Sequence, residues 1–230
     1  MKKNTMLRIA SVLMIAVMIT TCAVSGTFAK YVTDGEATDT ARVAKFGVNV
    51  TVTAETFEDT YDGVEAGWTS KSTVDGQGED VVAPGTSGDA IGITLTGTPE
   101  VAVRVTYNAD LELGDKWMVD SDDNGSADLF YCPIIFVING VEYSAEGVGA
   151  ADADAYETYI ENKIAESNKE YAPNTDLSSV GGDYVQVSWK WLFSTSDTND
   201  VYDTFLGDQA AAGNAATIDL KLNVTVTQID

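Results

Sequence analysis

Histidine is absent from the whole sequence, and its absence limits the chemistry that this chain could perform. Without imidazole there is no Ser-His-Asp triad, no Cys-His nucleophile pair and no HExxH zinc site. Carboxylates, hydroxyls and lysines remain, but among 36 acidic residues no pair stands out as the general acid and base of a glycosidase. The sequence therefore predicts a protein that is not an enzyme and that requires no cofactor.

An acidic loop before Leu129 carries the most specific metal-binding pattern in the chain. Its oxygen-bearing side chains take the first, third, fifth and ninth positions of a calcium-type loop, with Gly125 at the sixth. These candidate ligands are Asp120, Asp122, Asn124 and Asp128. Tyr131 stands at the twelfth position, where a bidentate glutamate is expected. We predict a structural Ca²⁺ site here, with a simple acidic turn as the alternative.

Two other groups of residues invite a chemical interpretation but fit a hydrophobic core better. Cys132 lies in an apolar run, and no histidine is present to lower the pKa of its thiol, so we predict an inert core thiol. Trp189 and Trp191 resemble a platform on which sugar rings stack. However, both indoles fall in phase with the two valines before them, which predicts that they pack in the core.

The elements that would position these residues are mostly β-strands. Apolar and polar residues alternate with a period of two in five segments, which is typical of half-buried antiparallel strands. The segments are 44–52, 91–95, 101–105, 185–191 and 218–226. A further apolar run, 132–138, ends at Asn139 and Gly140 and resumes at Val141, which predicts a β-hairpin with a type I′ turn.

One segment, 151–169, breaks this alternation. Its large apolar residues recur at three- and four-residue spacings, which predicts an amphipathic helix. We expect segments 55–80 and 194–214 to be irregular, apart from a short helical turn near Ala210. The predicted fold class is an all-β, antiparallel, jelly-roll-like β-sandwich with one amphipathic helix and long loops, preceded by a cleavable signal helix.

The N-terminus has the three parts of an export signal. Lys2, Lys3 and Arg8 precede or open an apolar run, and small residues end at Ala29, so we predict cleavage between Ala29 and Lys30. Residues 1–29 are therefore assigned to a signal peptide, and residues 30–230 to a single domain that is secreted to the extracellular matrix or the cell surface. A retained membrane anchor is the alternative, in which the uncleaved signal peptide alone would contact the membrane.

Cleavage would make an already acidic chain more acidic. It would remove three of the 13 basic residues and none of the 36 acidic ones, so the formal net charge would change from −23 to −26. Such a surface repels phosphate groups, so neither nucleic acid nor an anionic lipid surface is an expected partner. Cys22 would leave with the signal peptide, so Cys132 would have no intrachain disulfide partner and stability would depend on the core.

Six short segments, spread over nearly the whole chain, share features with one known group of proteins. Two lie near the signal junction, at residues 26–31 (GTFAKY) and 41–46 (ARVAKF). The others are residues 82–88 (VAPGTSG), 188–191 (SWKW), 200–207 (DVYDTFLG) and 226–230 (VTQID). Together they resemble the proteins that a SipW-type signal peptidase processes in Gram-positive bacteria, the TasA/camelysin-like family.

The resemblance implies a jelly-roll subunit that a SipW-type signal peptidase processes and that is deposited in a biofilm matrix, where TasA-like members form fibres. Its partners would be further copies of itself or related matrix subunits. In such fibres an N-terminal segment of one subunit completes a sheet of the next, and residues 30–40 are the counterpart here. The alternative function is a cell-surface binding module for a glycan or a host protein.

A third function follows from the same resemblance, because camelysin-like proteins are also classed as metallopeptidases. This sequence has no histidine and no HExxH motif, so no zinc site is recognisable in it. A secreted peptidase is therefore the least favoured of the three functions.

Overall fold

The computed structural model describes residues 42–53, 56–62, 73–122, 124–193 and 196–229. The chain divides into two compact units, Met1–Lys45 and Phe46–Asp230, and all the described helices and strands belong to the second. The predicted signal peptide, its cleavage site at Ala29 and Lys30, and the arm at residues 30–40 lie outside the described residues.

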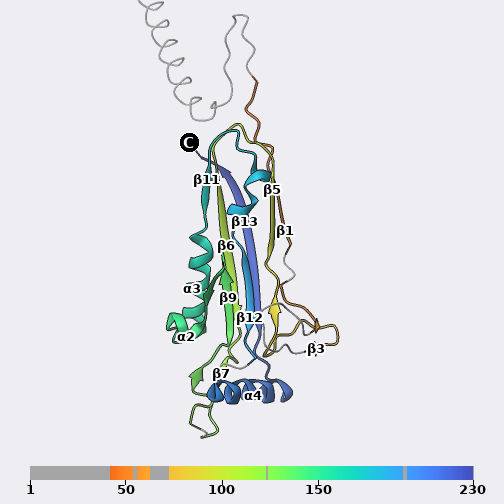
Figure 1. Ribbon diagram of the computed structural model, residues 1–230. Coiled ribbons are helices and arrows are strands. Elements are labelled where there is room, and N and C mark those ends of the chain that lie inside the picture. Colours follow the sequence, from red (N-terminus) through yellow and green to blue (C-terminus); the bar gives the residue numbers. More distant parts are fainter. Residues whose placement is uncertain (1–41, 54–55, 63–72, 123, 194–195, 230) are drawn as a thin grey trace, which may run out of the picture. The chain divides into compact units, whose positions relative to one another are not determined.

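Antiparallel β-structure dominates the second unit (Figure 1). Each pairing between described strands is antiparallel, so the β-rich class predicted from the alternating pattern is confirmed. The strands are β1 (Asn49–Thr53), β2 (Thr60–Asp62), β3 (Thr73–Asp75), β4 (Ser87–Gly88), β5 (Gly92–Thr96), β6 (Val103–Leu113), β7 (Met118–Val119), β8 (Leu129–Phe130), β9 (Ile134–Ile138), β10 (Val141–Tyr143), β11 (Lys169–Tyr171), β12 (Val187–Trp191) and β13 (Ile218–Gln228).

The longest ladder joins β6 and β13 in a sheet of order β11-β6-β13. The two strands pair over 11 residues, from Ile218 opposite Leu113 to Gln228 opposite Val103. The strand predicted at 218–226 is confirmed. The strand predicted at 101–105 is longer than expected, because the alternation of apolar and polar residues continues from Val105 to the end of β6.

A second sheet has the order β10-β9-β12-β4 and contains the predicted hairpin. Asn139 and Gly140 have φ angles of 51° and 79°, the two positive values that a type I′ turn requires, and β9 and β10 pair on either side of them. The hairpin prediction is therefore confirmed. β12 pairs with β9 in a register that sets Trp189 opposite Phe136.

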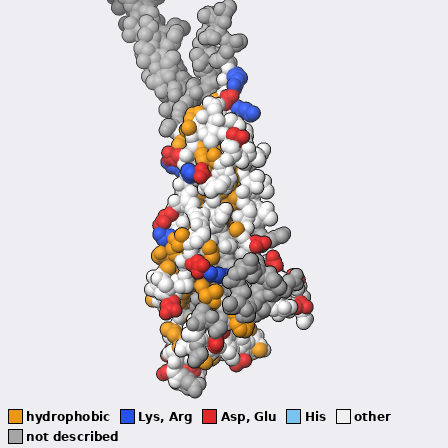
Figure 2. Space-filling view, viewed as in Figure 1, with side chains coloured by type: hydrophobic (Ala, Val, Ile, Leu, Met, Phe, Trp, Pro, Cys, Tyr) orange, Lys and Arg blue, Asp and Glu red, His pale blue; other side chains and the backbone are white. Residues whose placement is uncertain are grey.

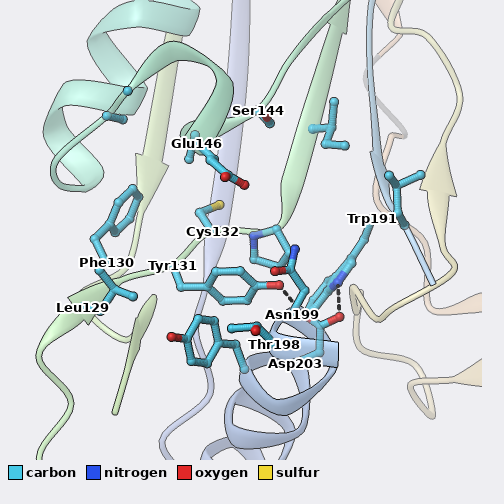
Figure 3. Close-up of a pocket in the computed structure, with 17 residues that line it drawn as sticks. Leu129, Phe130, Tyr131, Cys132, Ser144, Glu146, Trp191, Thr198, Asn199 and Asp203 are labelled. Carbon is cyan, nitrogen blue, oxygen red and sulfur yellow. Dashed lines mark hydrogen bonds between the residues drawn. The ribbon is translucent and has the colours of Figure 1, made fainter. Parts of the chain in front are cut away.

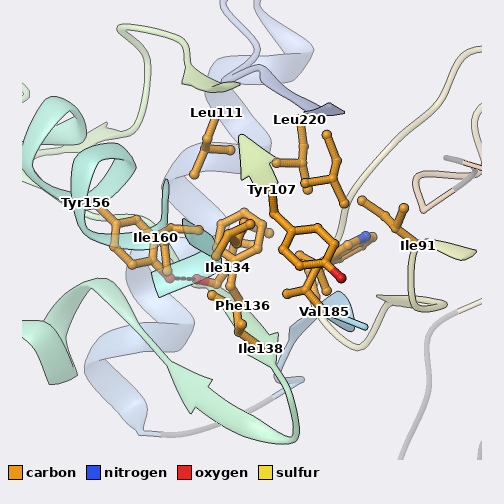
Figure 4. Close-up of a cluster of buried hydrophobic side chains, with 14 of the residues drawn as sticks. Ile91, Tyr107, Leu111, Ile134, Phe136, Ile138, Tyr156, Ile160, Val185 and Leu220 are labelled. Atoms are coloured by element: carbon orange, nitrogen blue, oxygen red, sulfur yellow. Dashed lines mark hydrogen bonds between the residues drawn. The ribbon is translucent and has the colours of Figure 1, made fainter. Parts of the chain in front are cut away.

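Both of these sheets contribute side chains to one hydrophobic core (Figure 4). Helix α3 (Ala153–Ala165) adds Tyr156, Ile160 and Ile164, which are fully buried, and it confirms the amphipathic helix predicted within 151–169. The Tyr156 hydroxyl donates a hydrogen bond to the carbonyl of Ile134 over 2.8 Å, which ties the helix to β9. The short helix α2 (Ala145–Val148) precedes α3, and the 3₁₀ segment η1 (Leu177–Asp183) follows β11.

The prediction of a single helix is wrong, because helix α4 (Asp197–Ala211) occupies most of the segment expected to be irregular. Ser196 caps this helix, since its hydroxyl accepts a hydrogen bond from the backbone N–H of Asn199 over 3.1 Å. Leu206 is the one buried residue within 198–211. The helix therefore lacks the wide apolar stripe by which an amphipathic helix is recognised in a sequence.

The two remaining N-terminal predictions also need correction. The strand expected at 44–52 is limited to β1, and its apolar side is buried only in part. Val48 and Val52 pack against the core, whereas Phe46 and Val50 are each 39% exposed. The segment 55–80 is not wholly irregular, since β2 and β3 pair within it. Acidic side chains lie scattered over the face shown in Figure 2, in keeping with the charge of the chain.

Candidate functional site

A pocket of about 800 Å³ opens where α2, α4 and the segment leading into β9 meet (Figure 3). Apolar and aromatic side chains make up most of its wall. They include Phe130, Tyr131, Pro133, Trp191, Leu192 and Tyr202. Cavities of this size with a few converging polar groups are typical of small-molecule sites, so this pocket is the main candidate in the described part of the chain.

Helix α4 brings Asp203 to the wall of the pocket. Oδ1 of Asp203 accepts a hydrogen bond from the Tyr131 hydroxyl over 2.7 Å, and Oδ2 accepts one from the indole N–H of Trp191 over 3.2 Å (Figure 3). The Tyr131 ring meets the Tyr202 ring edge to face, with centroids 5.1 Å apart. Residues from three separate parts of the sequence are thus held in one polar and aromatic group.

The surroundings of Asp203 and Tyr131 raise the pKa values of both side chains. Burial is the main cause that raises the pKa of Asp203, the nearby charge of Asp200 raises it too, and the hydrogen bonds from Tyr131 and Trp191 oppose the rise. Burial and the adjacent Asp203 carboxylate raise the pKa of Tyr131. No Lys or Arg of the described residues forms an ion pair with Asp203.

Cys132 also lines the pocket, but the environment of its thiol opposes reactivity. The residue is 5% exposed, and burial raises the pKa of its thiol to about 12. The prediction that Cys132 lies in the core is confirmed, and the same is true of Trp189 and Trp191, which are 1% and 5% exposed. The indole N–H of Trp189 donates to the carbonyl of Thr56 over 2.6 Å and is not available to a ligand.

The four predicted calcium ligands lie together on the exposed loop between β7 and β8, and Asp120 organises it. Its carboxylate accepts hydrogen bonds from the backbone N–H groups of Asp122, Asn124 and Gly125. Although desolvation acts in the opposite direction, these bonds lower the pKa of Asp120. Asp128 closes the loop by accepting the N–H of Ser121 over 3.0 Å.

The loop is thus folded by its own backbone, and the calcium site stays a prediction. Within the described residues, which exclude Asp123, no group of three or more acidic or cysteine side chains is arranged to hold a metal ion. Apart from this loop, acidic side chains also gather around a recess of about 580 Å³, which is lined by Glu58, Asp59, Asp80 and Asp89.

The residues of this pocket are not among the site residues that the sequence predicted. Asp203 and Tyr202 lie in a segment expected to be a loop, and Tyr131 stands out in the sequence only as a departure from the calcium pattern. A signal for α4 is nevertheless present, because Ser196 is a good N-cap and residues 199, 202, 203 and 206 follow at helical spacing. In a helix over these residues, Tyr202 and Asp203 lie on the side of α4 that lines the pocket.

Among the described helices, none is both long enough and apolar enough to cross a membrane. No protein-family model, no curated protein and no solved structure matches this chain.

Proposed function

We propose that this chain is a secreted structural subunit of an extracellular or biofilm matrix, and that it assembles with other copies, or with related subunits, by strand pairing. A SipW-type signal peptidase would release it by cleavage between Ala29 and Lys30. The proposed architecture is a jelly-roll-like β-sandwich in which the β11-β6-β13 and β10-β9-β12-β4 sheets form the two layers.

One observation carries the proposal: the long strand β13 stands at the end of its sheet. Among the described strands it has a hydrogen-bonded partner, β6, on one side only. β1 approaches β13 but pairs with β5 instead (Figure 1). An edge of this length is a template for a strand from another chain, because main-chain hydrogen bonds supply the affinity.

On the opposite side of the same sheet, the edge of β6 is covered, unlike the outer side of β13 in the described part of the chain. β11 pairs with the first part of β6, and side chains of α3 and its C-terminal extension bond to the rest. The N–H groups of Leu113, Leu111 and Tyr107 donate to Glu157 (2.6 Å), Glu161 (3.0 Å) and Asn168 (2.7 Å), respectively. Natural proteins cover sheet edges that must not pair with other chains, as the edge of β6 is covered here. No described strand pairs with the outer side of β13, so β13 is a candidate assembly edge.

The N-terminal region supplies the natural donor. Residues 30–40 would become the free N-terminus after cleavage, and they lead into β1, which lies beside β13. The exposed apolar side chains of Phe46 and Val50 would gain a covering surface from a neighbouring subunit. Strand addition by residues 30–40 of one copy to β13 of the next would therefore combine main-chain pairing with apolar burial.

The test is electron microscopy of the purified chain that begins at Lys30. We expect filaments from the intact mature chain and monomers when residues 30–40 are deleted. A sharper test compares Thr38→Pro with Thr38→Ala. Proline removes a backbone donor and blocks strand pairing, whereas alanine preserves the backbone, so only the proline variant should fail to assemble.

Two results would reject strand donation. Filaments formed by the chain without residues 30–40 would show that another surface drives assembly. A mature chain that remains monomeric at all accessible concentrations would remove the structural function and favour the binding module, for which the pocket beside α4 is the supporting feature.

A further inference from the structure

We propose that the pocket between α2 and α4 binds an organic ammonium group carried on an apolar body, with Asp203 as its counter-ion and aromatic rings as its walls. This inference does not depend on assembly, because the pocket lies at α2 and α4 and not along β13.

The charge of the pocket selects cations. Its lining contains two carboxylates, Glu146 and Asp203, and no Lys or Arg. Cys132 is neutral at physiological pH because burial raises its thiol pKa to about 12, so the charge of the lining comes from the two carboxylates. Glu146 lies on the exposed α2 side and Asp203 on the α4 side, so a cation entering the pocket meets carboxylates from two elements (Figure 3).

Asp203 has unused capacity for such a ligand. Each of its oxygens accepts one hydrogen bond, from the Tyr131 hydroxyl and from the Trp191 indole. A carboxylate oxygen has room for two, so each oxygen retains one acceptor direction. Both present donors are neutral, and a partly buried carboxylate gains most from a partner that also brings a positive charge.

The walls suit the rest of the ligand. Tyr131 and Tyr202 are held edge to face at 5.1 Å, and Phe130 and Trp191 line the same space. The faces of aromatic rings attract ammonium groups, and their apolar surface favours a carbon skeleton over a bare metal ion. A space of about 800 Å³ accepts a molecule larger than a single side chain.

The same chemistry has two sources, a free amine and the side chain of a lysine in a peptide. The first arm of the test uses three probes with one aromatic body: 2-phenylethylamine, 2-phenylethanol and phenylacetate. Binding to the mature chain is followed at pH 7 by Trp fluorescence and calorimetry. We expect the amine to bind about tenfold or more tightly than the alcohol, and the anion to bind most weakly, as a charge-assisted hydrogen bond requires.

Two variants locate the site, and a third serves as the control. Asp203→Asn should remove the preference for the amine over the alcohol. Glu146→Gln alters an exposed side chain, so it should leave folding intact and weaken amine binding by about threefold. Glu112→Gln makes the same change in charge on the exposed side of β6, away from the pocket, and should leave binding unchanged.

The second arm separates the two sources. It uses the blocked peptide acetyl-Gly-Lys-Gly-amide and its acetyl-lysine counterpart, which lacks the charge. A preference for the lysine peptide over its acetyl-lysine counterpart that Glu146→Gln weakens and Asp203→Asn removes identifies a peptide side chain as a ligand. Binding of the amine without the peptide identifies a small molecule. Equal affinity for amine and alcohol, or an amine preference that survives Asp203→Asn, would overturn the proposal.

Discussion

Burial, and not a neighbouring charge, decides the chemistry of Cys132. Burial raises its thiol pKa from 9.0 to about 12, which lowers the thiolate fraction at pH 8 by roughly a thousandfold. We expect alkylation by iodoacetamide at pH 8 to be at least about a hundredfold slower in the native chain than in urea. Mass spectrometry of timed samples measures both rates. Comparable rates would mean that the thiol is accessible and that it could act as a nucleophile.

We expect Asp203 to make the free energy of unfolding depend on pH. The pKa of its carboxyl is raised in the folded chain, so its contribution to stability is fully present below the unfolded pKa of about 3.9 and is lost as the pH rises through the folded pKa. The free energy of unfolding of the wild-type chain, relative to Asp203→Asn, should therefore increase as the pH falls from 7 to 4.

Urea denaturation of both proteins at a series of pH values checks this difference. The other titratable groups around Asp203, namely Tyr131, Cys132, Glu146 and Asp200, are present in both chains, so their effects largely cancel in the comparison. If the difference decreases on acidification, the carboxylate is better stabilised in the folded state than in water, and Asp203 then needs no cationic ligand as its counter-ion.

The predicted calcium site has an equally direct test at the level of single side chains. If Asp120 and its neighbours bind Ca²⁺, millimolar Ca²⁺ should raise the melting temperature of the mature chain, and Asp122→Ala should abolish the shift. Asp122 is the better position to change, because Asp120 also holds the loop by accepting three backbone N–H groups. The absence of a shift in the wild-type chain would reduce the loop to an acidic turn.

At the scale of elements, α3 acts as a replacement for a strand beside β6. Four residues along a helix rise about 6 Å, and two residues along a strand rise about 6.8 Å. Glu157 and Glu161 can therefore reach alternate N–H groups of β6, at Leu113 and Leu111, as they do here. This agreement of spacings explains why a helix can protect the sheet edge.

Removing one of these acceptors should destabilise the fold. Glu161→Ala leaves the N–H of Leu111 without its partner, and we expect a loss of about 1–3 kcal/mol in the free energy of unfolding. Glu161→Gln retains a carbonyl acceptor and should cost much less. Hydrogen exchange of the Leu111 amide should accelerate in the alanine variant alone. Equal stability of the two variants would show that water replaces the side chain at this position.

The elements that the sequence predicted well are those with a strict local signal. Apolar and polar residues alternate along β13 without interruption. Asn139 and Gly140 specify the hairpin turn by their own preference for positive φ angles. α4 was missed because its stability depends on a cap and on one buried side chain, Leu206, and not on a broad apolar stripe. The apolar side of β1 is only partly covered, since Val52 packs against the core and Val50 is exposed, and a period of two alone does not reveal how much of a strand another layer covers.

The pocket could not be predicted for a different physical reason. The tertiary fold brings Tyr131, Trp191 and Asp203 together. No local sequence pattern around any of the three residues predicts its contact with the other two. In the sequence, Tyr131 is only a departure from a metal-loop pattern and Trp191 is only a core indole. A site built from three distant segments needs the strand register and the position of α4 before it can be recognised.

At the scale of the whole molecule, the net charge of −23, or −26 after cleavage, opposes the association of identical subunits. Strand addition at β13 would bring two such chains into contact, so assembly must overcome their repulsion. In the proposed assembly the attraction would come from main-chain hydrogen bonds and apolar burial, which salt weakens little. The repulsion is screened within about 10 Å at 0.1 M salt and about 3 Å at 1 M. Assembly should therefore depend steeply on ionic strength.

We expect the rate of filament growth, measured by light scattering and checked by electron microscopy, to rise about tenfold or more between 20 mM and 500 mM NaCl. A matched pair of variants on the exposed side of β13 tests the cause. Thr225→Lys should accelerate growth at low salt and Thr225→Glu should slow it, and the two rates should converge at high salt. Growth that slows as salt is added would instead mean that ion pairs hold the subunits together, and pairing at an uncharged main-chain edge would no longer explain the assembly.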